Sequence, residues 1–211
     1  MSNLPAHRLH AIVDVQVASQ AGWDPVDLAR AFLDGGGRVL QLRAKESPSG
    51  RFLELCDRLV AAAIGYSALV IVNDRVDLAR MSGARGVHVG QEDLAPSIAR
   101  DQLGPAAVVG FSTHSVPQVE AALREPVSYV AVGPVFGTST KDTGYDAVGL
   151  DLVRAASRTA GTMPIVAIGG VTLENAPSAL AAGAASVAVI SDLVAGGDPA
   201  ARVKAYLRAL A

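Results

Sequence analysis

The sequence contains a single cysteine, Cys56, and only 4% of its 211 residues are aromatic. One cysteine excludes a small secreted domain held together by disulfides. Lys and Arg number 18 against 20 Asp and Glu, so the formal net charge is -2. Because the chain has neither a basic excess nor aromatic platforms for stacking bases, we expect no nucleic acid among its partners.

Long apolar runs are also missing. The longest, such as Ala61–Ile64 and Ser186–Ile190, are far shorter than the roughly 20 residues that a membrane-spanning helix needs. Residues Met1–His10 contain no apolar stretch of the kind found in signal peptides. We therefore expect a soluble, cytoplasmic protein with no membrane partner.

The chain does have enough apolar material for one sizeable core. Hydrophobic residues make up 50% of it and charged residues 18%, a balance that excludes an intrinsically disordered chain. No linker, low-complexity tract or block of like charge interrupts the sequence. We therefore predict a single domain over residues 1–211.

Two local patterns alternate along the chain. Short, continuous apolar runs rich in β-branched residues are typical of strands buried on both faces of a parallel sheet. They predict strands at His10–Val15, Arg38–Leu42, Ala68–Val72, Gly86–Val89, Ala107–Phe111, Tyr129–Val132, Pro164–Ile168 and Ser186–Ile190. Apolar residues at helical spacing predict helices at Asp24–Asp34, Ser49–Ile64, Val116–Leu123, Leu150–Ser157, Leu173–Ala181 and Pro199–Ala209.

Eight strands alternating with helices, at intervals of about 26 residues, fit a (β/α)8 barrel or a doubly wound open sheet. A dinucleotide-binding open sheet carries a glycine-rich turn after its first strand, but here Asp14-Val15-Gln16-Val17 follows. We therefore predict the α/β class and a single-domain (β/α)8 TIM barrel. Its active site is expected at the carboxyl ends of the strands.

Two cations follow the second predicted strand. Gln41, Arg43 and Lys45 alternate in sequence, so a strand would place their side chains on one face. A guanidinium and an ammonium group on one inward face are suited to an anion such as phosphate. The alternative is a pair of surface cations at a fraying strand end.

Two carboxylates follow the next two predicted strands. Asp74 and Asp93 would repel each other at one barrel mouth unless a cation lay between them. Magnesium suits such a site, because it uses one or two carboxylates together with water and substrate phosphates. The alternative is that each aspartate caps a helix, in the case of Asp74 one over Val76–Met81.

Two further segments are suited to phosphate. Thr138, Ser139, Thr140 and Lys141 form a hydroxyl-rich stretch with one cation. Gly169-Gly170 follows the seventh predicted strand and Ile190-Ser191 the eighth, which is where barrels commonly bind phosphate through backbone amides. The mouth is thus expected to have a charged half and a neutral half.

Three other residues carry side chains capable of chemistry. His88 lies within a predicted strand and is expected to be a hydrogen-bonded interior residue. His114 lies in a mouth loop and is a candidate for function. Cys56 lies on the apolar face of its predicted helix and is expected in the core.

Five motifs, in order along nearly the whole chain, resemble those of the thiamine-phosphate synthase family. They are Gln41-Leu42-Arg43-x-Lys45, Val72 to Ala79, Gly86 to Leu94, Gly133-Pro134-Val135-Phe136-x-Thr138-x-Thr140-Lys141 and Ile168-Gly169-Gly170-Val171. The resemblance implies a (β/α)8 barrel enzyme, a transferase. It would join a pyrimidine methyl diphosphate to a thiazole phosphate with one magnesium ion per subunit, releasing diphosphate. Diphosphate would leave before the thiazole nitrogen attacks.

The resemblance also implies roles for individual residues. Asp74 and Asp93 would hold magnesium. Arg43, Lys45, Ser112 and Lys141 would be catalytic. The pyrimidine substrate would contact Gln41, Arg43, Lys45, Asn73, Ser112 and Lys141, and Leu42 and Ala44 would also be substrate-binding. The thiazole phosphate would contact Thr138, Ser139, Thr140, Gly170, Ile190 and Ser191.

The chain departs from the family at its first strand. The family usually has Thr-Asp where this chain has Val13 and Asp14. A homo-oligomer is compatible with the sequence, which does not define the number of copies.

Two other functions remain open at this stage. A thiazole tautomerase on the same scaffold would use a histidine such as His114 and needs no second metal carboxylate, so Asp93 together with Thr140-Lys141 favours the synthase. A non-catalytic phosphometabolite-binding barrel would need the phosphate glycines but neither Asp74 nor Asp93.

Overall fold

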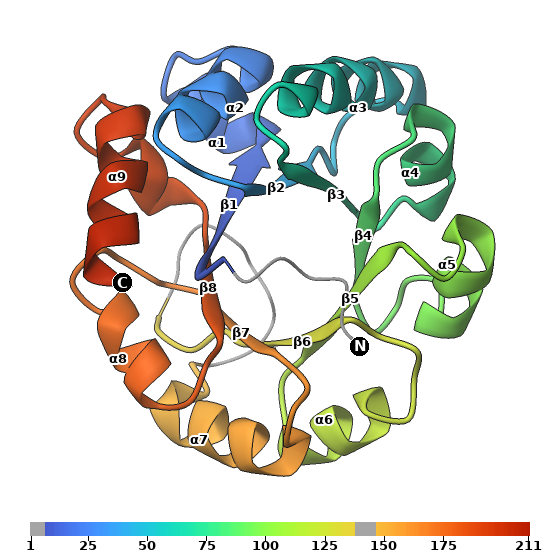
Figure 1. Ribbon diagram of the computed structural model, residues 1–211, viewed down its shortest axis with the longest axis vertical. Coiled ribbons are helices and arrows are strands. Elements are labelled where there is room, and N and C mark those ends of the chain that lie inside the picture. Colours follow the sequence, from blue (N-terminus) through green and yellow to red (C-terminus); the bar gives the residue numbers. More distant parts are fainter. Residues whose placement is uncertain (1–6, 138–146) are drawn as a thin grey trace.

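The protein is a closed barrel of eight parallel strands. The computed structural model describes residues 7–137 and 147–211. Each strand pairs with its sequence neighbours, and β1 pairs with β8 to close the ring (Figure 1). The strands are β1 (Leu9–Asp14), β2 (Val39–Arg43), β3 (Leu69–Asn73), β4 (Gly86–Val89), β5 (Val108–Thr113), β6 (Tyr129–Val132), β7 (Ile165–Ile168) and β8 (Ser186–Val189). The predicted (β/α)8 fold is confirmed.

Helices form a ring around the outside of the barrel (Figure 1). They are α1 (Val15–Gln20), α2 (Pro25–Asp34), α3 (Ser49–Ile64), α4 (Val76–Ser82), α5 (Pro96–Leu103), α6 (Val116–Ala122), α7 (Gly149–Ala160), α8 (Ala176–Ala181) and α9 (Pro199–Ala209). A short 3-10 helix, η1 (Ser191–Val194), follows β8. Within the described residues, no helix is long and apolar enough to cross a membrane.

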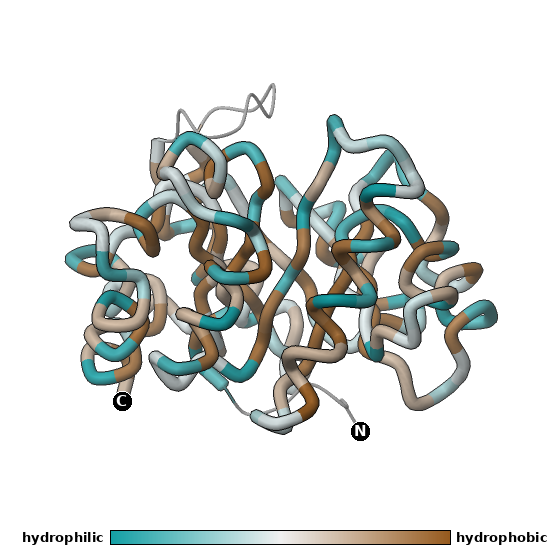
Figure 2. The backbone as a smooth tube through the Cα atoms, turned by 90° about the horizontal axis from the view of Figure 1, so that it is seen from above, coloured by the Kyte–Doolittle hydropathy of each residue, from teal (hydrophilic) through white to brown (hydrophobic). Residues whose placement is uncertain are grey.

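Alternation along each strand divides the core into two layers. One set of strand side chains packs outward against the helices, where it meets residues such as Phe32 and Leu59. Cys56 belongs to this outer layer, as predicted, and burial raises the pKa of its thiol to about 12. The other set fills the barrel itself and includes Ile12 and Ile71. The hydrophobic stretches of the backbone accordingly run through the middle of the molecule (Figure 2).

On β1, β2, β3 and β5 the interior positions near the carboxyl end are polar. Val39 is followed at interior positions by Gln41 and Arg43, and Ile71 is followed by Asn73. On β5 the corresponding sequence runs from Val108 through Gly110 to Ser112, and on β1 from Ile12 to Asp14. The polar members lie at the carboxyl ends, so strand alternation carries them to one mouth.

One helix signal in the sequence is confirmed and two expectations are corrected. The Asp24 carboxylate accepts from the backbone N–H groups of Val26 and Asp27, so it caps α2 as expected. The predicted strand His10–Val15 instead ends at Asp14, whose carboxylate caps the helix α1, which was not predicted. The alternative reading of Asp74 and Asp93 as helix caps is wrong, because α4 and α5 begin after Arg75 and Ala95 without a side-chain cap.

His10 is enclosed in the barrel interior, where its Nε2 lies 3.3 Å from the Ser186 hydroxyl and its ring lies edge-on to Tyr129. Burial, with a smaller effect of His7, lowers the pKa of His10 from 6.5 to about 4. Between these values the unfolded chain binds a proton that the folded chain excludes. The free energy of unfolding should therefore fall as the pH drops through this range, by at most about 3 kcal/mol from this residue.

This contribution can be isolated by replacing His10 with glutamine, which does not titrate. Urea unfolding at pH 7 and pH 4.5 should show a smaller loss of stability for His10→Gln than for the wild type, because carboxyl groups titrate alike in both proteins. An equal loss in the two proteins would show that His10 does not titrate in this way.

Candidate active site

The polar mouth of the barrel brings together most of the described residues predicted for the site. Gln41 and Arg43 come from β2, Asn73 ends β3, Ser112 lies on β5, and Gly170, Ile190 and Ser191 follow β7 and β8. Asp74 and Asp93 lie in the loops after β3 and β4. Because all eight strands are parallel, these positions share one end of the barrel. The predicted Thr138, Ser139, Thr140 and Lys141 lie outside the described residues.

Leu42 and Ala44 are placed differently from the other predicted residues of the second strand. Both side chains are buried in the layer between barrel and helices. Only the backbone of these residues is therefore available to a ligand at the mouth. Lys45 lies beyond the end of β2 and is 55% exposed, so it reaches the mouth from a loop and not from the strand face.

Lys45, Asp74 and Asp93 form a charged cluster. The Lys45 ammonium lies 3.4 Å from Asp74 Oδ2, and the Asp74 and Asp93 carboxyl groups are within hydrogen-bonding reach of each other. Burial raises the pKa of Asp74, the nearby Asp93 carboxyl raises it further, and Lys45 partly opposes both effects. Two carboxyl groups so close together favour either a shared proton or a cation between them.

The donor set of this cluster fits a hard divalent cation. Asp93 is held in place by the Gly90 N–H, which donates to its Oδ2 over 2.7 Å. Within the described residues no group of three or more His, Cys, Asp or Glu side chains converges on one point. A cation bound by Asp74 and Asp93 would therefore take its other ligands from water and substrate oxygens, as magnesium usually does.

Arg43 is fixed by a buried ion pair with Asp14. Its Nη1 lies 2.6 Å from Asp14 Oδ2, and the two side chains are 14% and 4% exposed. The other carboxylate oxygen of Asp14 accepts from the backbone N–H groups of Gln16 and Val17. The Arg43 Nε is buried and has no hydrogen-bond partner in the described part of the chain. Asp14 thus orients the cation, a role that the sequence analysis did not assign.

Ser112 is joined to the barrel core by a chain of hydrogen bonds. Its Oγ lies 2.8 Å from His88 Nε2, and His88 Nδ1 lies 2.9 Å from the Tyr129 hydroxyl. Gly110 makes room for this chain, because a Cβ there would lie 2.1 Å from the Tyr129 ring. His88 is therefore the hydrogen-bonded interior residue that was predicted, and it also holds the hydroxyl of a predicted site residue.

The protons of this chain can be assigned from its chemistry. Burial raises the pKa of Tyr129, so its hydroxyl stays protonated and can donate to His88 Nδ1. In the tautomer that accepts from Tyr129 at Nδ1, His88 donates from Nε2 to Ser112 Oγ. The Ser112 hydroxyl is left to donate its own proton to an acceptor at the mouth.

The loops after β7 and β8 form the neutral half of the mouth. Gly170 has φ +62°, and a Cβ there would lie 2.4 Å from the carbonyl oxygen of Gly137. Glycine is thus required by the loop backbone itself, in addition to allowing close approach of an anion. Strands β7 and β8 are hydrogen-bonded neighbours, so this loop lies beside Ile190 and Ser191.

His114 is engaged by the backbone of the next strand end. Its Nδ1 lies 2.5 Å from the Gly133 carbonyl oxygen, which can only accept, so Nδ1 carries the ring proton. The histidine is thereby oriented by the segment that follows β6.

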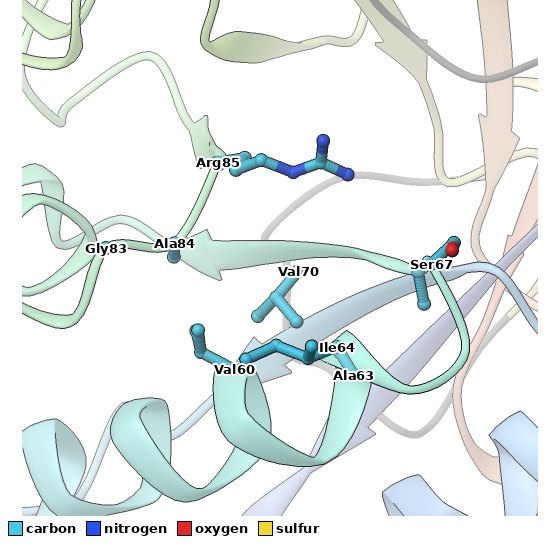
Figure 3. Close-up of a pocket in the computed structure, with 9 residues that line it drawn as sticks. Val60, Ala63, Ile64, Ser67, Val70, Gly83, Ala84 and Arg85 are labelled. Carbon is cyan, nitrogen blue, oxygen red and sulfur yellow. The ribbon is translucent and has the colours of Figure 1, made fainter.

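An apolar groove of about 470 Å³ lies at the opposite end of the barrel (Figure 3). It is lined by residues at the end of α3 and just before β3 and β4, including Ile64, Ala68 and Arg85. None of the predicted site residues lines it. This amino-terminal end of a barrel generally contributes to stability and not to catalysis.

Comparisons with known proteins identify the family of the chain. Residues 9–193 match the family model described as thiamine monophosphate synthase. The chain is 41% identical over 214 residues to the thiamine-phosphate synthase of Koribacter versatilis, covering 99% of this chain and 98% of the relative. It is 42% identical over 191 residues to that of Anaeromyxobacter dehalogenans, covering 89% of this chain and 85% of the relative.

A solved structure shows the same fold over nearly the whole length. Thiamine phosphate pyrophosphorylase from Pyrococcus furiosus superimposes with a TM-score of 0.86 at 28% identity, covering 97% of this chain and 96% of that one. With the family model and the two relatives, this match gives one answer: the chain belongs to the thiamine monophosphate synthase family.

Proposed function

We propose that this protein is a thiamine-phosphate synthase, a transferase that joins a pyrimidine methyl diphosphate to a thiazole phosphate and releases diphosphate. Membership of the family supports this function. The observation that carries it is the Lys45–Asp74–Asp93 cluster beside Arg43 at the barrel mouth. A departing diphosphate needs such a site, because one more negative charge develops on this already anionic group as the bond to carbon breaks.

Charge stabilisation, with no general base, is the main task of these residues. Arg43 and Lys45 would bind the diphosphate, and Lys141, outside the described residues, would add a third cation. Asp74 and Asp93 would hold Mg²⁺, which when bound supplies further neutralisation of the diphosphate oxygens. The carbon–oxygen bond would break first, and the thiazole nitrogen would then attack the pyrimidine methyl cation.

Uncharged polar groups of the barrel interior would orient the pyrimidine. Gln41 and Asn73 are buried at the polar ends of β2 and β3, where their amides can pair with ring nitrogens and an amino group. Ser112 would donate a hydrogen bond from its fixed position on His88. Correct orientation holds the reacting carbon facing the second substrate.

The thiazole phosphate would occupy the neutral half of the mouth. Gly170, Ile190 and Ser191 would surround its phosphate, with Thr138, Ser139 and Thr140 completing the site. Backbone amides can hold this group without competing for the diphosphate. Charged side chains would thus bind the diphosphate in one half of the mouth, and backbone amides would bind the thiazole phosphate in the other.

Turnover of both substrates, measured with magnesium and with excess chelator, tests the proposed function directly. A synthase forms thiamine phosphate and diphosphate only when the pyrimidine and thiazole substrates are both present, and needs the metal. Isomerisation of a thiazole alone would identify a tautomerase, and binding without turnover would identify a non-catalytic phosphate-binding barrel. Wild-type turnover in excess chelator would contradict the magnesium site.

Asp93→Asn should reduce turnover by roughly 100-fold or more, because it weakens the cation site that stabilises the leaving group. The amide oxygen can still accept from the Gly90 N–H, so the loop should keep its shape. The measurement is kcat as a function of magnesium concentration. Glu92→Gln, in the same exposed loop, is the matched charge control. Equal activity and magnesium dependence in the two variants would contradict the role of Asp93.

Asp14→Asn should weaken the fixation of Arg43 while retaining an oxygen that can cap α1. We expect kcat/KM for the pyrimidine substrate to fall by roughly 10-fold, which is the effect of about 1.4 kcal/mol. The control is Asp24→Asn, since Asp24 makes the same two-amide cap on α2 but pairs with Arg58, 3.5 Å away, and not with a predicted site residue. Equal losses in both variants would assign the effect to helix capping alone.

A further inference from the structure

The carboxylate of Asp192 lies at the centre of an interaction cluster beside the proposed phosphate site. Asp192 directly follows Ser191 in η1, and its side chain is only 16% exposed. Arg202 Nη2 lies 2.8 Å from both carboxylate oxygens, and the Tyr206 hydroxyl donates to Oδ2. The backbone N–H of Leu173 donates to the same oxygen over 3.1 Å.

These contacts connect three segments that are distant in sequence. Leu173 belongs to the loop after β7, Asp192 to the helix after β8, and Arg202 and Tyr206 to α9. Arg202 also donates from Nε to the backbone carbonyl oxygen of Asp192, over 3.1 Å. The position of η1 is therefore fixed through both the main chain and the side chain of Asp192.

The loop after β7 is braced by hydrogen bonds between its own residues. The Asn175 side chain donates to the Gly170 carbonyl oxygen over 3.0 Å and accepts from the Thr172 N–H over 2.8 Å. Through the Leu173 N–H, Asp192 attaches this braced loop to η1. Gly170 and Ser191 are consequently held at a set spacing.

The negative charge of Asp192 has to be neutralised, because it lies beside the proposed phosphate site. An unpaired carboxylate one residue from Ser191 would repel a phosphate bound there. The Arg202 guanidinium contacts both carboxylate oxygens, and the Tyr206 hydroxyl and the Leu173 N–H also donate to it. The pair is close to neutral as a unit, so it can brace an anion site without opposing the anion.

We propose that Asp192, supported by Arg202 and Tyr206, is a positioning residue that sets the spacing between Gly170 and Ser191 for the phosphate of the thiazole substrate. This inference rests on the proposed function, which places that phosphate between the two loops. Asp192 acts through the Leu173 N–H and through η1, and not by contact with the substrate.

The test compares the two ligands separately in Asp192→Ala and Asp192→Asn. In Asp192→Ala the Kd for the thiazole phosphate should rise at least 10-fold, while the Kd for the pyrimidine diphosphate should change less than twofold. KM for the thiazole phosphate should rise likewise, and kcat at saturation should be largely retained. Asp192→Asn, which keeps an acceptor for the Leu173 N–H, should recover part of the affinity. Tyr206→Phe, which removes one donor, should have a smaller effect of the same kind.

Asp198→Ala is the matched control for damage to α9. Asp198 caps this helix by accepting from the Ala201 N–H, and among the described residues it makes no hydrogen bond to the loops after β7 and β8. Melting curves of all variants accompany the calorimetric titrations. If Asp198→Ala weakens the thiazole phosphate as strongly as Asp192→Ala does, or if both ligands weaken together, the role of Asp192 is merely structural and the proposal fails.

Failure of this inference is distinguishable from failure of the proposed function. Absence of wild-type turnover with both substrates and magnesium would contradict the function. Normal wild-type turnover with an unchanged thiazole phosphate Kd in Asp192→Ala would overturn only the positioning role. If Asp192→Ala does not fold, the same titrations are made with the milder variants Asp192→Asn and Tyr206→Phe. An unchanged Kd for the thiazole phosphate in both variants would overturn the proposal.

Discussion

Closure of eight parallel strands into a barrel is the constraint on which the rest of the structure depends. Closure directs every second side chain inward and brings all the carboxyl ends to one mouth. Interior positions such as Val39 and Ile71 can then be apolar, while Gln41 and Asn73, one interior position further on, are polar. A single periodicity thus supplies both a packed core and a site with many polar groups.

Much of this arrangement was predictable because it follows from local patterns. Continuous β-branched runs predicted the strands, and polar residues just after them predicted Arg43, Asp74 and Ser112 at one mouth. The helix α1 was not predicted. It begins where the Asp14 carboxylate accepts from the backbone N–H groups of Gln16 and Val17, and in the sequence Asp14 lies within an apolar run that predicts a strand. The roles of Asp14 and Asp192 depend on partners on other elements, which spacing along the chain does not reveal.

The mouth balances its charges by pairing them before any ligand arrives. Arg43 is paired with Asp14, Lys45 with Asp74, and Arg202 with Asp192. The most buried of these pairs fixes a guanidinium in one orientation, whereas the Lys45 contact is longer and more exposed. Burial makes the first pair expensive to rearrange, and the second can exchange partners when a polyanion binds.

The exposure of Lys45 also makes its ion pair sensitive to salt. The ammonium group is 55% exposed, so dissolved ions, with a Debye length of about 10 Å at 0.1 M, can screen its contact with Asp74. The Arg43–Asp14 pair is buried, and mobile ions scarcely reach it. Raising the ionic strength therefore loosens the Lys45 side chain far more than Arg43, so the two cations of the mouth differ in how strongly the medium sets their position.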